Sequence, residues 1–154
     1  MDNLTPVKKL ELGCWPTPLQ ELTNMGRILG NGKRLFLKRD DLCGVGLGGN
    51  KVRKLEYILA EALEQGCDCV VTGGGSRSNQ PIAAACANRV GLSAYLVMPE
   101  RTGVVPRYLA QQLGAVILPV EAGESGTVPK VVRQTAKALR EQGRKPYLIP
   151  PGAS

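Results

Sequence analysis

Short apolar runs alternate with segments of helical periodicity along most of this chain. The pattern predicts strands at 34–38, 69–72, 94–98, 115–120 and 147–149, and helices at 51–65, 82–88, 105–113 and 127–142. Apolar strands that alternate with helices through short loops are typical of a parallel sheet with helices on both faces. The sequence therefore predicts an α/β fold with a parallel sheet covered by helices.

Residues at the helix ends support these boundaries. Pro81 and Pro106 stand early in two of the helices, where the missing N–H has no partner to lose. Gly66 follows the first helix, where it can take a left-handed conformation. We expect Thr127 to cap the last helix through its side-chain oxygen.

The length and hydropathy of the chain limit its class. At 154 residues it suits a single domain of common size. No apolar run approaches the roughly 20 residues that a membrane helix needs, so we expect no membrane segment. The first residues lack a basic stretch followed by an apolar one, so they do not resemble a secretory signal, and we expect a cytoplasmic protein.

The net charge of +7 raises the question of a nucleic-acid partner. Lys51, Arg53 and Lys54 form the densest basic cluster, and no aromatic residue stands among them. Six aromatic residues in the whole chain are too few for a surface on which single-stranded bases stack. A small anion such as a phosphate or a carboxylate explains the charge better, and we expect no nucleic-acid partner.

The chain contains no histidine. This excludes catalysis by Ser–His or Cys–His pairs and removes the most common metal ligand. Five cysteines occur without a C-x-x-C spacing, and they are Cys14, Cys43, Cys67, Cys69 and Cys86. We expect buried, reduced thiols and no metal site.

A glycine-rich segment at 44–49 contains a formal G-x-G-x-x-G pattern after a strand and before a helix. Taken alone, this pattern is a weak indication of dinucleotide binding. Residues 40–43 separate the strand from the first glycine, Lys51 occupies the helix start, and Glu64 lies in the same helix. These departures disfavour a dinucleotide site, and a nucleotide-dependent oxidoreductase is kept as an alternative.

Lys51 stands where the glycine-rich loop becomes a helix, with Arg53 and Lys54 directly after it. The positive end of the helix and two neighbouring cations disfavour a further charge on this amine. A neutral amine is what Schiff-base formation with an aldehyde requires, and the same donors can bind a phosphate. Lys51 is therefore a candidate nucleophile. The alternative is a solvated lysine in a first helical turn.

A second polar segment, 72–80, follows a buried strand and begins a helix. Ligands bind at the carboxyl ends of strands in open α/β sheets, so we expect this segment and Lys51 to face one crevice. Ser78 can act as a nucleophile or proton carrier only beside a base, and Lys51 or a tyrosine is the candidate base. The alternative is that Ser78 and Asn79 merely cap the helix.

Several strings in the chain resemble one family of enzymes. They are Trp15-Pro16-Thr17-Pro18-Leu19, Lys38-Arg39-Asp40-Asp41-Leu42, Gly48-Gly49-Asn50-Lys51-Val52-Arg53-Lys54-Leu55-Glu56-Tyr57, Ser78-Asn79-Gln80 and Pro146-Tyr147-Leu148-Ile149-Pro150. In these strings the chain resembles the D-cysteine desulfhydrase and aminocyclopropane-carboxylate (ACC) deaminase family. These are pyridoxal-phosphate enzymes of the tryptophan synthase β-like fold, also called fold type II. The resemblance covers nearly all of the chain.

The resemblance implies a pyridoxal 5'-phosphate cofactor and roles for five residues. Lys51 would bond covalently to the cofactor aldehyde, Lys54 would help to bind the cofactor phosphate, and Asn79 would meet the ring hydroxyl. Ser78 would be the catalytic or substrate-contacting hydroxyl, and Asn79 and Gln80 would lie near the substrate carboxylate. Gln80 is the variant of the deaminase branch. The residues beside it depart from the family pattern, which leaves the substrate open.

The resemblance also implies a domain division and an activity. Residues 1–45 would be the N-terminal segment of the cofactor domain and residues 46–154 a small α/β domain, with the rest of the cofactor domain absent. The implied enzyme is a homodimeric lyase or deaminase that acts on a small amino acid. It would release an α-keto acid and ammonia, with sulfide if the substrate is D-cysteine. The alternative is a truncated, non-catalytic fragment that binds the cofactor weakly or pairs with another chain.

Overall fold

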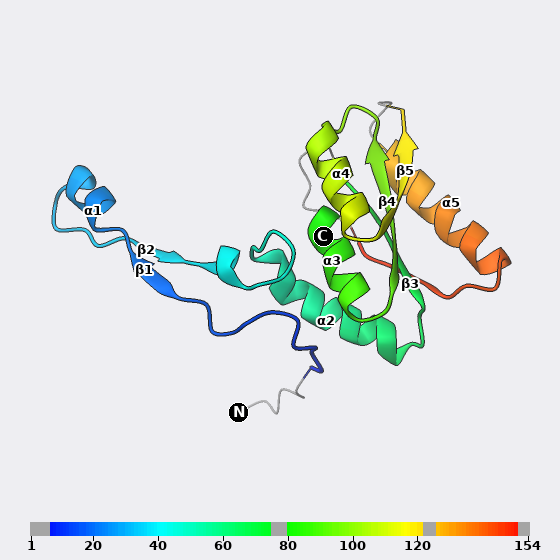
Figure 1. The fold of residues 1–154 in the computed structure, drawn as a ribbon, viewed down its shortest axis with the longest axis horizontal. Helices are drawn as coiled ribbons and strands as arrows, with labels where there is room; N and C mark the ends of the chain where they lie inside the picture. The colour runs from blue at the N-terminus through cyan, green and yellow to red at the C-terminus, as the bar shows by residue number, and fades with distance from the viewer. Residues whose placement is uncertain (1–6, 75–79, 122–125, 151–154) are drawn as a thin grey trace.

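The computed structural model of the chain describes residues 7–74, 80–121 and 126–150. Its centre is a four-stranded parallel sheet in the order β5-β4-β3-β6 (Figure 1). The strands are β3 (Cys69–Gly73), β4 (Ser93–Pro99), β5 (Ala115–Val120) and β6 (Pro146–Leu148). Cys69 at the start of β3 is paired with Ser93 on one side and with Pro146 on the other. The predicted parallel sheet is confirmed.

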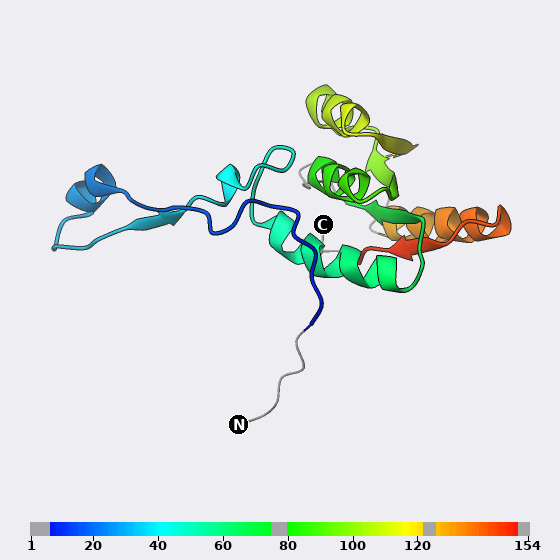
Figure 2. The ribbon, with the colours of Figure 1, turned by 60° about the horizontal axis from the view of Figure 1, so that its bottom comes forward.

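Four helices cover this sheet, which confirms the predicted α/β class. They are α2 (Lys51–Glu64), α3 (Gln80–Arg89), α4 (Val104–Gln112) and α5 (Thr127–Glu141). Figure 2 shows α5 on one side of the sheet and α3 and α4 on the other, with α2 beside α3. Helices therefore lie on both faces, as alternating apolar strands and helices require.

The prediction that Thr127 caps α5 is wrong. Gly126, and not Thr127, occupies the capping position before the helix. The φ of Gly126 is +119°, a backbone conformation that glycine adopts without the cost that a Cβ brings. The chain therefore enters α5 through a glycine turn, and Thr127 is already the first helical residue.

The main core fills the space between the sheet and the pair α2 and α3. Val52, Leu55 and Leu59 of α2 are fully buried at the spacing of one helix face. Full burial of each leucine stabilises the fold by about 2 kcal/mol. α3 contributes small buried side chains that let it approach the sheet closely, namely Ala83, Ala84, Cys86 and Ala87. A smaller cluster joins β3 to α5 on the other face.

Residues 19–38 form an arm that extends away from the sheet (Figures 1 and 2). The arm contains β1 (Leu19–Glu21), α1 (Thr23–Leu29) and β2 (Phe36–Lys38), and a short 3-10 turn, η1 (Asp40–Leu42), follows it. β1 and β2 pair antiparallel as a separate two-stranded ribbon. The strand predicted at 34–38 therefore belongs to the arm and not to the parallel sheet.

Candidate functional site

A tight loop delivers Lys51 to the first position of α2. Gly48 has a φ of +73°, and a Cβ on it would lie 2.1 Å from the backbone oxygen of Asp41, so the loop requires glycine there. The N–H of Gly49 donates to the backbone oxygen of Asp40 at 2.7 Å. The loop is therefore held against η1 immediately before the lysine.

Lys54 lies one helical turn after Lys51, and both side chains are half-buried. Burial lowers the pKa of Lys54, and the adjacent Lys51 side chain lowers it further through a hydrogen bond and its charge. Two amines held this closely favour an anion beside them, because it offsets their repulsion. The pair suits a ligand that carries an anionic group next to an atom that an amine attacks.

The loop before Lys51 packs against α3. A Cβ on Gly49 would lie 3.8 Å from Cδ1 of Ile82, and a Cβ on Gly46 would lie 3.1 Å from Cβ of Ala85. Ile82 is in the first turn of α3. The loop that leads to Lys51 is therefore a neighbour of α3, which begins at Gln80, the last residue of the predicted segment.

Gln80 is fully buried at the start of α3. Its Nε2 donates to the backbone oxygen of Val97 in β4 at 3.4 Å, and its Oε1 has no hydrogen-bond partner in the described part of the chain. Buried acceptors without a donor are rare, and a bound molecule or water can supply the donor. Ser78 and Asn79, the other predicted residues of this segment, lie outside the described residues.

Thr17, Asp40 and Arg53 form a cluster of hydrogen bonds on another side of α2. The sequence did not reveal these residues as a group. Arg53 donates from Nε and Nη2 to the two carboxylate oxygens of Asp40, both at 2.7 Å. Thr17 Oγ1 donates to the same carboxylate at 2.6 Å. The bonds from Arg53 and Thr17 hold the pKa of Asp40 far below its usual range. The Arg53 guanidinium also lies over the Trp15 ring, 4.1 Å from its centroid.

Glu56, three residues after Arg53, fastens the N-terminal segment to α2. Its Oε1 accepts the indole N–H of Trp15 at 2.5 Å and the N–H of Leu12 at 3.0 Å. Burial raises the pKa of Glu56, but these bonds and the charge of Lys9 outweigh burial and lower it. Arg53 and Glu56 are three residues apart and therefore lie on one side of α2, and this spacing is the local feature of the sequence that could have indicated that both face the N-terminal segment.

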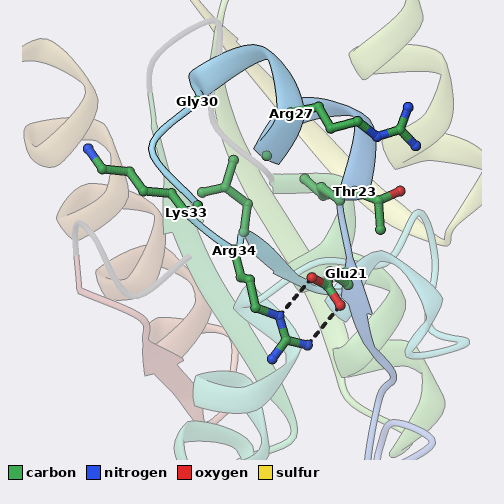
Figure 3. Close-up of a pocket in the computed structure, with 10 residues that line it drawn as sticks. Glu21, Thr23, Arg27, Gly30, Lys33 and Arg34 are labelled. Atoms are coloured by element: carbon green, nitrogen blue, oxygen red, sulfur yellow. Dashed lines mark hydrogen bonds and ion pairs between the residues drawn. The ribbon is translucent and has the colours of Figure 1, made fainter.

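A cavity of about 450 Å³ lies on the arm, between the end of β1, α1 and the loop that leads to β2 (Figure 3). Arg34 and Glu21 form a two-bond ion pair on its wall, at 2.8 and 2.9 Å. Figure 3 shows the side chains of Arg27 and Lys33 pointing away from this ion pair. The cavity is lined by residues 21–35, so it is separate from the elements around Lys51.

The thiols are mostly structural. Burial raises the pKa of Cys69 and of Cys86 to about 12, which keeps both protonated. The prediction that the cysteines are buried holds for Cys43, Cys69 and Cys86, but it is wrong for Cys14, which is exposed, and for Cys67, which is only half-buried. Within the ranges that the structure describes, no cluster of metal-ligating side chains forms and no helix could cross a membrane.

Known proteins are similar to this chain in sequence and in fold. The chain is 35% identical over 164 residues to the 1-aminocyclopropane-1-carboxylate deaminase of Burkholderia lata, covering 99% of this chain and 48% of that protein. It is 37% identical over 160 residues to the mitochondrial bifunctional D-cysteine desulfhydrase/1-aminocyclopropane-1-carboxylate deaminase of Arabidopsis thaliana, covering 97% of this chain and 39% of that protein. The solved structure of an ACC deaminase homologue is 39% identical, with a TM-score of 0.86 over 95% of this chain and 45% of that chain.

The chain thus spans less than half the length of these relatives. Its sheet and helices match part of a fold type II pyridoxal-phosphate enzyme, which confirms the fold that the sequence motifs implied. Residues 10–154 match the family model described as pyridoxal-phosphate dependent enzyme. This chain belongs to the family of pyridoxal-phosphate dependent enzymes.

Proposed function

We propose that this chain carries the lysine-bearing part of a pyridoxal-phosphate lyase or deaminase that acts on a small amino acid. The observation that carries the proposal is the place of Lys51, the first residue of α2, behind a glycine loop and one turn before Lys54. The lowered pKa of Lys54 adds to it, because burial and the adjacent Lys51 amine both disfavour the charge of Lys54. The names of the two relatives support the reaction class.

The residues around Lys51 fit pyridoxal phosphate chemically. The cofactor has an aldehyde, which a primary amine attacks, and a phosphate, which cations and helix N-termini bind. Lys51 offers the amine at the start of α2, and a phosphate beside Lys54 would favour the charged form of that side chain. When bound, the cofactor serves as an electron sink for the substrate carbon.

The residues of this chain would divide the remaining tasks. Lys51 would hold the cofactor and is the candidate base, Ser78 would move a proton for the substrate, and Asn79 would bind the ring hydroxyl. Gln80 lies near the substrate carboxylate. Since its side chain is buried and bonded to Val97, we propose that its backbone N–H at the start of α3 meets that carboxylate.

We propose ACC or D-cysteine as the substrate, following the names of the relatives. Hydrolytic deamination of ACC yields an α-keto acid and ammonia. D-Cysteine would yield an α-keto acid, ammonia and sulfide. Both substrates release ammonia but only D-cysteine releases sulfide, so a sulfide assay separates the two.

The test of this function is to map where the cofactor attaches. The purified chain is mixed with pyridoxal phosphate, reduced with borohydride and digested, and the modified lysines are found by mass spectrometry. We expect the label at Lys51 and little at Lys145, an exposed lysine near the start of β3 that serves as the internal control. Lys51→Ala should lose the label. Equal labelling of both lysines would overturn the proposal.

A second candidate function is assembly with another copy of this chain. Leu19, Ile28 and Phe36 of the arm expose 64%, 79% and 48% of their surface. A two-stranded ribbon with exposed apolar side chains gains stability when another surface covers it. We propose that the arm is an interface of a homodimer, whether or not the chain is catalytic by itself. Sedimentation at increasing concentration tests this, and a monomer throughout would overturn it.

A further inference from the structure

Asp40 contacts the chain on both sides of Lys51. Its backbone oxygen accepts the N–H of Gly49 at 2.7 Å, two residues before the lysine. Its carboxylate accepts both nitrogens of the Arg53 fork at 2.7 Å, two residues after the lysine. A single residue of η1 therefore fixes the loop that enters α2 and the first turn of the helix.

Neighbouring side chains hold the ion pair of Asp40 and Arg53 in place. Thr17, which is almost fully buried, donates to the Asp40 carboxylate at 2.6 Å and lies within 3.3 Å of Arg53 Nη2. Only 13% of the Asp40 side chain is exposed. The guanidinium of Arg53 stacks on Trp15, so it is held from a third direction. Fork-shaped pairs of this kind fix geometry as well as charge.

The ion pair of Asp40 and Arg53 does not block the amine of Lys51. Successive residues of an α-helix are rotated by about 100°, so Arg53 lies nearly opposite Lys51 around the helix axis. Lys54, which interacts with Lys51, is about 60° from Lys51 and about 100° from Arg53 around the same axis. Asp40 and Arg53 therefore set the rotation and depth of the first turn without occupying the side where a ligand of Lys51 would bind.

We propose that Asp40 is a positioning residue for Lys51, acting through Arg53 and Gly49. The proposal rests on the proposed function, in which Lys51 carries the cofactor. A displacement of about 1 Å at a reacting group can cost a hundredfold in rate. Asp40→Asn keeps the backbone contact to Gly49 but loses the charged fork, so we expect the rate of pyridoxal-phosphate labelling at Lys51 to fall about tenfold.

A matched control is available at the other end of α2. Asp68 accepts Nε of Arg144 at 2.7 Å and the N–H of Lys145 at 2.9 Å, much as Asp40 binds a side chain and a loop. It precedes β3, at the end of the sheet away from the start of α2. Asp68→Asn should lose stability as Asp40→Asn does and leave labelling at Lys51 unchanged.

The readout is the share of all pyridoxyl label that is found at Lys51 after a short exposure, together with amide hydrogen exchange of residues 49–53. Asp40→Asn should lower the share and speed the exchange. Arg53→Lys, which keeps the charge but not the fork, should do the same, because a lysine cannot make the two parallel bonds that fix the orientation of the pair. Neither change is expected in Asp68→Asn.

The outcomes separate the two proposals. If the unaltered chain is not labelled at Lys51, the proposed function fails. If the unaltered chain is labelled at Lys51, and Asp40→Asn shows the same share of label there and the same hydrogen exchange at residues 49–53, the positioning role of Asp40 is wrong. If Asp40→Asn does not fold, Thr17→Val removes one bond to the same carboxylate more mildly. Thr17→Val should then lower the Lys51 share about twofold and Thr17→Ser should restore it, and an unchanged share in Thr17→Val would overturn the proposal.

Discussion

The carboxylate of Glu56 accepts the indole N–H of Trp15 at 2.5 Å. The same oxygen accepts the backbone N–H groups of Leu12 and Gly13. One buried side chain therefore fastens the segment that precedes the arm to the helix that carries Lys51.

Replacement of Glu56 should be costly. We expect Glu56→Ala to lower the free energy of unfolding by about 3 kcal/mol, because three donors lose a buried acceptor. Glu56→Gln keeps one oxygen in place and should cost less than half of that. Glu64→Ala, at an exposed position of the same helix, is the control, with an expected cost below about 0.5 kcal/mol. Urea unfolding measures all three, and equal costs for Glu56→Ala and Glu64→Ala would contradict the prediction.

Asp68 should make stability depend on pH. Burial raises its pKa, but hydrogen bonds from Cys69, Lys145 and Arg144 lower it to about 2. A carboxyl with a lowered pKa in the folded chain stabilises fully above its ordinary pKa, and this stabilisation disappears as the pH falls toward the lowered value. Because the side chain is 45% exposed, we expect Asp68→Asn to cost only about 1 kcal/mol at neutral pH. The difference from the unaltered chain should shrink between about pH 4 and pH 2, and a constant difference in unfolding free energy would contradict this.

The loop before Lys51 should not tolerate a side chain at Gly48. A Cβ there would lie 2.1 Å from the backbone oxygen of Asp41, at a φ of +73°. Gly66 has a similar φ of +67° but nothing within 4 Å. We expect Gly66→Ala to cost about 1 kcal/mol from backbone strain and Gly48→Ala about 3 kcal/mol or more from strain and overlap. Thermal unfolding checks both, and similar costs would show that the loop moves aside.

Substitutions at the contact between β3 and α5 should have non-additive effects on the free energy of unfolding. A Cβ on Gly73 would lie 2.6 Å from Cγ1 of Val128 and 2.8 Å from Cγ2 of Val132. We expect Gly73→Ala to cost about 2 kcal/mol by overpacking. In the double variant with Val128→Ala the cost should be smaller than the sum of the single costs by about 1 kcal/mol. Additive costs in a double-mutant cycle would mean that α5 shifts away from β3 freely.

The arm should govern self-association. We expect Ile28→Lys, at a position that is 79% exposed, to weaken the homodimer about tenfold or more while leaving thermal stability nearly unchanged. Val104→Lys is the matched control, because Val104 of α4 is 82% exposed and lies outside the arm. Sedimentation velocity gives the dissociation constants. Loss of association in Val104→Lys but not in Ile28→Lys would place the interface on α4.

Much of the fold could be predicted because local patterns encode it. Val52, Leu55 and Leu59 repeat at helical spacing, and Gly66 marks the end of α2, so the helix follows from the sequence. α1 could not be predicted in this way. It has seven residues and none of them is buried, so its side chains show no pattern that faces the core of this chain.

The candidate site divides in the same way. Lys51 could be predicted because the glycine loop, the helix start and the neighbouring cations are all local features of the sequence. The contact of Thr17, Asp40 and Arg53 could not, because it joins three separate segments of the chain. Motif resemblance pointed to the strings that contain these residues, but only tertiary packing shows that their side chains meet.

The order of strands in the sheet has a consequence for how the chain folds. β3 joins β4 across a single helix, whereas its other neighbour, β6, arrives much later, and the bond from Thr72 to Ile149 spans 77 residues. Closing the shorter loop loses less chain entropy, so we expect the pairing of β3 with β4 to precede that of β3 with β6. Until β6 arrives, the edge of β3 opposite β4 is unpaired, and partly folded chains expose that edge to each other.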